Sequence, residues 1–375
     1  MDYEAFEKGL SVPVVSGAEL TVVIPTFNER DNLNPLLDRL AVALEGLSWE
    51  AIFVDDDSSD GTADSVREIA QRCPHVRVIQ RIGRRGLASA CVEGVLSSSA
   101  PYFAVIDADM QHDETILPRM LNELKEGHLD IVVGSRYIDG GSVLGWDKRR
   151  QLISRAATGA ARLVTKTDLK DPLSGFFLMR RQAFDGAVRN LSQQGFKILL
   201  DLFASAPQPL RFAEVPYQFR SRIYGESKLD SMVVWEYGML LADKLFGRFI
   251  PPRLLFFGGI GALGLFVHMT VLAIALYGGL AFAASQTIAV LTAMTSNYTL
   301  NNLITYRDQR LRGWDWARGL LSFYVICAIG AIANVGIATF IYAREPRWWL
   351  AGLAGALVGA VWNYALSAYF TWKRK

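Results

Sequence analysis

Apolar and polar positions form alternating blocks along the N-terminal half of the chain. Short apolar runs rich in β-branched residues cover residues 20–25, 51–54, 76–79 and 102–106, and helical patterns lie between them at 33–44, 62–72 and 87–96. Such short apolar runs are typical of buried strands. Because strands that alternate with helices pair in parallel with helices on both faces, the pattern predicts a parallel, doubly wound α/β sheet.

The C-terminal third has a different pattern, because charged residues disappear from long segments. Residues 254–306, 319–343 and 348–372 contain no Asp, Glu, Lys or Arg. A helix needs roughly 20 apolar residues to cross a bilayer. The first segment is long enough for two crossings and each of the others for one. We therefore expect four transmembrane helices, at about residues 254–278, 281–304, 319–343 and 348–371.

Basic residues gather on one side of these expected crossings. They are Arg248, Arg253, Arg307, Arg310, Arg312, Arg318, Lys373, Arg374 and Lys375. The other side carries only Arg344 and Arg347, with Glu345 between them. By the positive-inside rule, the N-terminal domain and the C-terminus are both cytoplasmic. We expect a multi-pass protein of the cell (inner) membrane, with the lipid bilayer as a partner. No apolar signal segment opens the chain.

The charge-free region contains an internal repeat. Asn297-Tyr298 recurs 66 residues later as Asn363-Tyr364, and Thr305-Tyr306-Arg307 recurs as Thr371-Trp372-Lys373. A duplicated two-helix hairpin explains the offset, and both copies then have the same orientation in the membrane. The region before it, residues 231–253, is amphipathic and too charged to span. It is interpreted either as a helix in the membrane interface or as an ordinary packed helix.

Two acidic clusters follow predicted strands. Asp55, Asp56 and Asp57 come after the second apolar run, and Asp107 and Asp109 after the fourth. In doubly wound sheets, ligands bind beyond the carboxyl ends of the strands. Carboxylate oxygens are the ligands that Mg²⁺ and Mn²⁺ prefer, and a nucleotide sugar brings its diphosphate with such a cation. The clusters therefore predict a metal-bound nucleotide sugar. The net charge of +2 is too small to indicate a nucleic-acid partner.

Several motifs give this sequence a family resemblance. Four resemble motifs of the family 2 glycosyltransferases with a GT-A fold, namely Pro25-Thr26-Phe27-Asn28-Glu29, Asp55-Asp56-Asp57-Ser58-Ser59-Asp60-Gly61-Thr62, Asp107-Ala108-Asp109-Met110-Gln111-His112 and Gly134-Ser135-Arg136-Tyr137. Three are similar to those of the dolichol-phosphate mannose synthase group, namely Asp171-Pro172-Leu173-Ser174-Gly175-Phe176, Gly195-Phe196-Lys197 and Arg222-Ile223-Tyr224-Gly225-Glu226-Ser227-Lys228. The tail resembles the GtrA-like domain of some of these enzymes.

The resemblance implies an architecture. We expect an α/β GT-A (Rossmann-like) catalytic domain followed by an all-α transmembrane domain of four helices. The expected boundaries are 1–230 for the catalytic domain, 231–253 for the amphipathic connector and 254–375 for the GtrA-like domain.

The resemblance also implies roles for individual residues. A donor site would contain Pro25, Phe27, Glu29, Asp57, Asp107, Ala108, Asp109, Gln111, Arg222 and Lys228. Asp107, Asp109 and Gln111 would bind Mg²⁺ or Mn²⁺, and Asp109, Arg222 and Lys228 would carry the catalysis. Arg136, Arg150 and Ser154 would bind the acceptor phosphate, for which a planar guanidinium is well suited. Phe27 stands where many relatives have Tyr, so ring stacking is kept and a hydroxyl contact is lost.

Two residue assignments stay open at this point. His112 is a metal ligand or, as we favour, a structural residue, because hard cations prefer oxygen. Arg84 and Arg85 are interpreted as a solvated basic turn, with contact to a phosphate as the alternative.

The expected reaction is a metal-dependent, inverting transfer of mannose from GDP-mannose to a polyprenyl (dolichyl) phosphate. The acceptor phosphate is already ionised near neutral pH, so no strong general base is expected. One alternative is transfer from UDP-glucose or another UDP-sugar to the same acceptor. Another is a processive polysaccharide synthase, although the Gln-x-x-Arg-Trp motif of those enzymes is missing.

Overall fold

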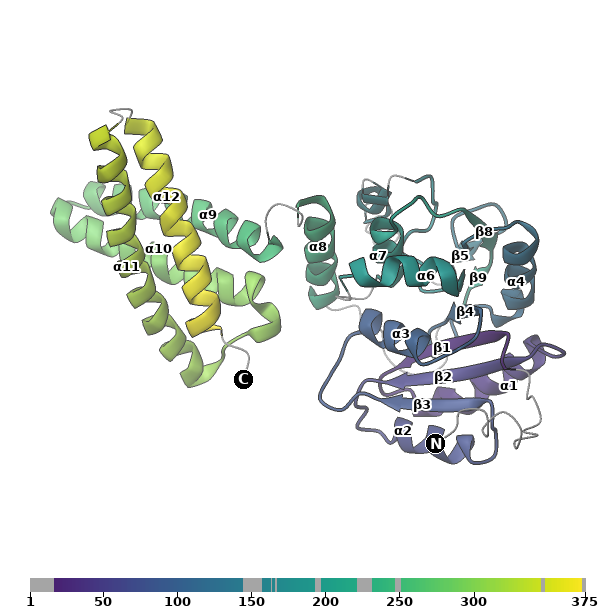
Figure 1. The fold of residues 1–375 in the computed structure, drawn as a ribbon. Coiled ribbons are helices and arrows are strands. Elements are labelled where there is room, and N and C mark those ends of the chain that lie inside the picture. Colours follow the sequence, from purple (N-terminus) through teal and green to yellow (C-terminus); the bar gives the residue numbers. More distant parts are fainter. Residues whose placement is uncertain are drawn as a thin grey trace, which may run out of the picture. The chain divides into compact units, whose positions relative to one another are not determined.

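The predicted apolar runs all form strands of one sheet. The computed structural model describes residues 17–143, 157–162, 164–165, 167–192, 197–220, 231–246, 251–344 and 348–372. Among these, a seven-stranded sheet has the order β3 (Val76–Gln80), β2 (Trp49–Asp55), β1 (Leu20–Thr26), β4 (Tyr102–Val105), β7 (Phe177–Arg180), β5 (Ile131–Ser135) and β8 (Phe212–Pro216). Contacts divide the chain into two units, Met1–Lys244 with this sheet and Leu245–Lys375, which is helical (Figure 1).

The four predicted strands pair in parallel, as expected, but the sheet as a whole is mixed. β3, β2, β1 and β4 are parallel neighbours, but β7 runs antiparallel to both β4 and β5. The segment before β7 explains the reversal. Gly175 lies beside the Asp107 carboxylate, at the carboxyl end of β4. The chain enters β7 from that edge and can only run in the opposite direction.

Helices cover both faces of the sheet, as a doubly wound pattern requires. α1 (Leu33–Ala43), α2 (Thr62–Ala70) and α4 (Leu117–Glu126) share one hydrophobic core with the strand residues Val22 and Ile24. α3 (Leu87–Leu96), α6 (Arg181–Ala187) and α7 (Ile198–Ser205) share the other with Val23. Successive residues of β1 thus point to opposite cores, because side chains alternate along a strand. A small two-stranded sheet pairs β6 (Ser142–Val143) with β9 (Gln218–Phe219).

The amphipathic region after the α/β fold forms α8 (Ser231–Phe246), which packs on the first unit. Leu240 is buried with Leu173 and Leu200. The Lys244 ammonium lies 2.6 Å from the Asp201 carboxylate, which is almost fully buried. These contacts favour the packed helix of the two interpretations. Contact of α8 with a membrane interface stays a prediction.

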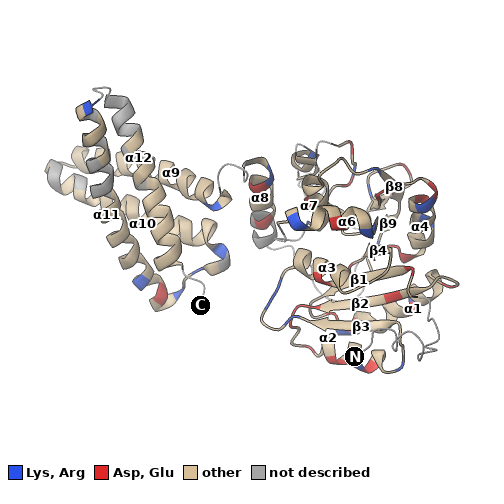
Figure 2. Cartoon of the chain, viewed as in Figure 1, with Lys and Arg blue, Asp and Glu red and all other residues tan. Residues whose placement is uncertain are grey.

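The second unit contains helices at the four predicted spans. They are α9 (Pro252–Tyr277), α10 (Phe282–Leu300), α11 (Gly313–Arg344) and α12 (Trp348–Leu366). In the described part of this unit, Lys, Arg, Asp and Glu are confined to the ends of the helices and to the segment that joins α10 to α11 (Figure 2). By length and apolarity, α9 is the helix among the described residues that could cross a membrane, with a mean hydropathy of 2.1. Crossing by the other three stays a prediction.

The internal repeat of the sequence recurs in the structure. α10 is continued by a π-helical turn, η5 (Asn301–Thr305), and α12 by another, η7 (Ser367–Thr371). Both helices and both turns are displaced by the same 66 residues that separate the sequence copies. A π-helical turn is rare, so its presence at matching positions supports duplication of a two-helix hairpin.

A close glycine–asparagine contact also occurs once in each hairpin. Gly264 lies against the Asn297 side chain, and Gly330 lies against that of Asn363. Both asparagine Oδ1 atoms are buried without a conventional hydrogen-bond partner among the described residues. Each points to where a glycine Cβ would be, so the glycine Cα–H is the donor that this geometry offers. Small residues allow such close helix contacts in membranes.

This contact predicts that Gly264→Ala destabilises the helical unit. The added methyl group would overlap the Asn297 carboxamide, and overpacking of this kind costs about 1–3 kcal/mol. Thermal unfolding of the detergent-solubilised protein measures the change. Gly259→Ala is the matched control on the same helix, because nothing lies within 4 Å of its added Cβ. Equal stability of the two variants would contradict the contact, and adding Asn297→Ala to Gly264→Ala should restore stability.

Candidate active site

Parallel pairing brings the ends of β1, β2 and β4 to one edge of the sheet. Thr26 of β1 is opposite Asp55 of β2, and Val23 of β1 is opposite Val105 of β4. The residues that follow these strands therefore emerge side by side. Two predicted donor residues, Phe27 and Asp107, lie at this edge, beyond the carboxyl ends of the strands where α/β sheets bind ligands.

The first acidic cluster divides into two structural carboxylates and one at the site. Asp55 is fully buried and accepts hydrogen bonds from the backbone and hydroxyl of Ser58. Asp56 is buried and accepts from Arg81 at 2.5 Å and from the backbone N–H of Gly86 at 2.7 Å. Asp57 is half-buried, and its φ of 59° places it in the left-handed region. Asp57 is therefore the member that fits the predicted nucleotide contact.

The predicted residues Pro25, Phe27 and Glu29 surround the end of β1. Pro25 is the half-buried penultimate residue of the strand. Phe27 is half-buried, and the guanidinium carbon of Arg85 lies 4.2 Å from its ring centroid. The Glu29 Oε2 accepts a 2.7 Å hydrogen bond from Asn32. Asn32 precedes α1 without capping it by its side chain, and that side chain instead orients Glu29.

The second acidic cluster forms a tight turn after β4. The Asp109 Oδ1 accepts a 3.1 Å hydrogen bond from the backbone N–H of Gln111. The Gln111 side chain donates to the Arg220 carbonyl at 3.0 Å, and the Arg220 N–H donates to the Gln111 carbonyl at 2.8 Å. Asp109 is buried and Asp107 half-buried. Ala108 is a buried spacer that keeps the two carboxylates on one turn.

The chemistry of this turn fits Mg²⁺ or Mn²⁺. Two carboxylates and an amide oxygen are hard ligands and leave coordination positions for phosphate oxygens. Gly175 adds room, because a Cβ there would lie 3.0 Å from the Asp107 Oδ2. No group of three or more His, Cys, Asp or Glu forms a metal centre within the described residues. A cation held here would thus share its coordination sphere with its substrate.

His112 has a structural role in this turn. Its Nδ1 accepts a hydrogen bond from the backbone N–H of Asp107 at 3.3 Å. The buried ring stacks on Phe176, with centroids 5.3 Å apart, and also meets Tyr217 and Phe219. Burial lowers the pKa of His112 to about 4, so the imidazole is neutral and its Nδ1 can accept. The favoured interpretation of His112 agrees with these contacts.

Arg136, the predicted acceptor residue, is held by a buried carboxylate. Its Nε and Nη2 donate to Asp171 at 2.7 and 2.8 Å, and its backbone N–H donates at 3.1 Å. The Asp171 side chain is fully buried. Burial opposes the charged guanidinium, but hydrogen bonds to Asp171 outweigh it and raise the pKa of Arg136. The guanidinium also lies over the Phe219 ring, 5.3 Å from its centroid.

Lys197 is a site residue to which the sequence analysis assigned no role. Its Nζ donates to the Leu173 carbonyl at 3.3 Å. Burial lowers the pKa of Lys197 and nearby Arg136 lowers it further, while Asp107 and Asp171 oppose both effects. The ammonium is therefore near enough to Asp107 and to the Arg136–Asp171 pair for their charges to act on it. Its motif, Gly195-Phe196-Lys197, helped to identify the resemblance, but spacing alone does not bring α7 to the end of β4.

Four predicted residues lie outside the described part of the chain. They are the acceptor residues Arg150 and Ser154 and the catalytic residues Arg222 and Lys228.

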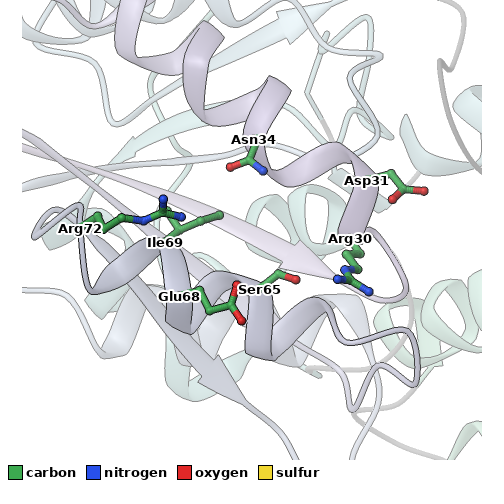
Figure 3. A pocket seen from close by; sticks show the side chains of 7 residues that line it. All are labelled: Arg30, Asp31, Asn34, Ser65, Glu68, Ile69 and Arg72. Atoms are coloured by element: carbon green, nitrogen blue, oxygen red, sulfur yellow. The ribbon is translucent and has the colours of Figure 1, made fainter.

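A surface cavity of about 490 Å³ lies apart from this site. Figure 3 shows that its side chains come from α2 and the residue Arg72 after it on one side, and from the short helix η2 (Arg30–Asn32) and the start of α1 on the other. Arg30 and Arg72 are balanced by Asp31 and Glu68 in the lining. None of its residues belongs to the predicted donor or acceptor sets.

Two family models match most of the chain. Residues 21–186 match glycosyl transferase family 2, and residues 256–372 match the GtrA/DPMS transmembrane domain. The α/β unit is thus a family 2 glycosyltransferase domain with a GT-A fold. The second match, together with α9, indicates a membrane protein.

Three relatives of this chain share one name. A dolichol-phosphate mannosyltransferase of Pyrococcus furiosus is 33% identical over 356 residues, covering 94% of this chain and 99% of the relative. The enzyme of that name from Saccharomyces cerevisiae is 34% identical and covers 64% of this chain and 91% of the relative. That from Mycosarcoma maydis is 36% identical and covers 66% of this chain and 88% of the relative.

Among solved structures, glucosyl-3-phosphoglycerate synthase from Mycobacterium tuberculosis, in complex with Mg²⁺ and uridine diphosphate, is similar to this chain. It has a TM-score of 0.45 and 22% identity, covering 62% of this chain and 79% of that chain.

The Arg136–Asp171 pair predicts that Asp171→Asn destabilises the α/β unit. Removing one partner of a buried ion pair leaves the other charge uncompensated and costs about 3–5 kcal/mol. Denaturant unfolding measures the loss. Asp168→Asn is the control, because Asp168 is exposed and its partner Lys170 remains in water. If Asp171→Asn were as stable as this control, the proposed burial of the Arg136 charge would be wrong.

Proposed function

The chain belongs to the dolichol-phosphate mannosyltransferase family of glycosyltransferases, and we propose that it transfers mannose from GDP-mannose to a dolichyl or other polyprenyl phosphate. The observation that carries this proposal is the acidic turn with a cationic pair beside it. Asp107 and Asp109 suit a cation-bound diphosphate, and Lys197 and Arg136 suit a second phosphate. A reaction between two phosphate-bearing substrates needs both a diphosphate site and a second phosphate site.

The donor diphosphate is proposed to bind at the turn after β4. Asp107, Asp109 and Gln111 would hold Mg²⁺ or Mn²⁺, which when bound neutralises the charge that develops on the leaving nucleoside diphosphate. Phe27, Glu29 and Asp57 would contact the nucleoside, supported by their place at the ends of β1 and β2.

The lipid phosphate is proposed to bind on the cationic side of the turn. Arg136 is oriented by Asp171 through two side-chain hydrogen bonds, so its charge is fixed in place before the acceptor arrives. Such preorganised charge lowers the cost of holding two phosphates close together. Arg150 and Ser154 would complete this acceptor site, and Arg222 and Lys228 would close over the donor.

The proposed chemical step is one displacement. An oxygen of the lipid phosphate forms a bond to the anomeric carbon of mannose, and the bond from that carbon to the GDP oxygen breaks with its electron pair. The configuration at the carbon inverts. The acceptor is a phosphate monoester whose second pKa is roughly 6, so it is ionised near neutral pH and no residue need remove a proton.

The match of the helical unit to a transmembrane domain supports an acceptor that is a membrane lipid. We propose that α9, α10, α11 and α12 all span the cell membrane, with the α/β unit and the C-terminus in the cytoplasm. The chain would then present its site to a polyprenyl phosphate in the inner leaflet.

Replacing Asp107 or Asp109 by Asn is predicted to lower transfer by about 10²–10³-fold, the usual cost of losing one electrostatic contact to developing charge. Transfer of labelled mannose from GDP-mannose to a short-chain polyprenyl phosphate in detergent measures the effect. Asp64→Asn is the control, because Asp64 is an exposed residue of α2 that pairs with Arg67. Normal transfer by both site variants would overturn the metal and diphosphate assignment.

Chelation with EDTA is predicted to stop transfer, and added Mg²⁺ or Mn²⁺ to restore it, because two carboxylates alone would repel the diphosphate. The same assay with UDP-glucose tests the donor. Activity that survives chelation would contradict the metal, and faster transfer from UDP-glucose than from GDP-mannose would contradict the proposed donor.

A further inference from the structure

The loop between β3 and α3 is fastened to the nucleotide edge of the sheet. Asp57 accepts a hydrogen bond from the Gly83 N–H at 3.2 Å, and Asp56 accepts from the Gly86 N–H at 2.7 Å. Arg81, at the start of the loop, also donates a hydrogen bond to Asp56. The donor-site residue Asp57 and the buried Asp56 before it thus determine where residues 81–86 lie. The loop is part of the architecture of this site.

The two adjacent arginines of this loop have different surroundings. Arg84 makes two hydrogen bonds to Glu93, at 2.6 and 3.1 Å. Arg85 is exposed, and its guanidinium covers the ring of Phe27 at 4.2 Å. Within the described part of the chain, no carboxylate forms an ion pair with Arg85. Arg84 is therefore bound to α3 through Glu93, whereas Arg85 lies on an aromatic residue of the donor site.

The position of the loop decides which part of a nucleotide Arg85 can reach. β3 and β4 are separated by β2 and β1, and neighbouring strands lie about 4.8 Å apart. The end of β3 is therefore roughly 14 Å from the turn with Asp107 and Asp109. A diphosphate at that turn would direct its nucleoside toward Phe27 and Arg85. Arg85 is thus positioned for the base, because its guanidinium lies over Phe27, a predicted contact of the nucleoside.

We propose that Arg85 is a specificity residue that stacks on the donor's nucleobase, with the base held between its guanidinium and the ring of Phe27. This inference rests on the proposed donor site. At 4.2 Å, the space between ring and guanidinium holds no further ring, so the exposed arginine moves outward when the base enters. A planar guanidinium stacks on aromatic faces, and a purine offers a larger face than uracil. The sandwich therefore favours GDP over UDP.

Competition assays with free nucleotides test this proposal. GDP, UDP and inorganic pyrophosphate are titrated against transfer from GDP-mannose by the wild type, Arg85→Ala, Arg85→Lys and Arg84→Ala. We expect Arg85→Ala to weaken inhibition by GDP by about tenfold or more, as for loss of base stacking. Inhibition by pyrophosphate should hardly change. The preference for GDP over UDP should shrink. Arg85→Lys should resemble Arg85→Ala, because the ammonium is not planar.

The kinetic pattern separates base contact from general damage. For Arg85→Ala we expect a higher KM for GDP-mannose with kcat within about twofold of the wild type, since uniform binding is lost. Arg84→Ala should behave as the wild type. The proposal would be overturned if Arg85→Ala bound GDP as tightly as the wild type does. It would also be overturned if the variant lost as much affinity for pyrophosphate as for GDP. A wild-type protein that did not bind GDP would instead contradict the proposed donor, and the purine sandwich with it.

Discussion

The parallel pairing of β1 with both β2 and β4 is the constraint on which the site depends. Each of these strands ends at the same edge of the sheet, so Phe27, Asp57 and Asp107 emerge together although they are far apart in the sequence. The antiparallel return through β7 begins at this edge as well and brings Gly175 against Asp107. The fold thus brings the donor residues together through the backbone hydrogen bonds of the sheet.

The charged residues around this edge of the sheet have different roles. Asp55, Asp56 and Asp171 are buried and hold Ser58, Arg81 and Arg136. These carboxylates fix loops and cations. Lys197 is near Arg136 and Asp107, and burial and the neighbouring cation disfavour its charge. A phosphate dianion bound there would relieve that repulsion, which is the physical basis of the proposed acceptor site.

Much of this could be predicted from local sequence. The four apolar runs identified the strands, and the acidic residues after them identified the edge, because both depend on periodicity and strand order. The direction of β7 could not, since it depends on where the chain returns to the sheet, beside Asp107 at the carboxyl end of β4, and this is a tertiary contact. The partner of Arg136 and the place of Lys197 also escaped prediction. Asp171 and α7 reach the site through tertiary packing, which spacing along the chain does not encode.

The most direct test of the account is to locate the bound metal. A crystal of the chain grown with GDP and Mn²⁺ would give an anomalous scattering peak for manganese. The account predicts that this peak lies between the carboxylates of Asp107 and Asp109 and the phosphates of GDP, with the base beside Phe27. A peak at the first acidic cluster, or a diphosphate bound away from the turn after β4, would contradict it.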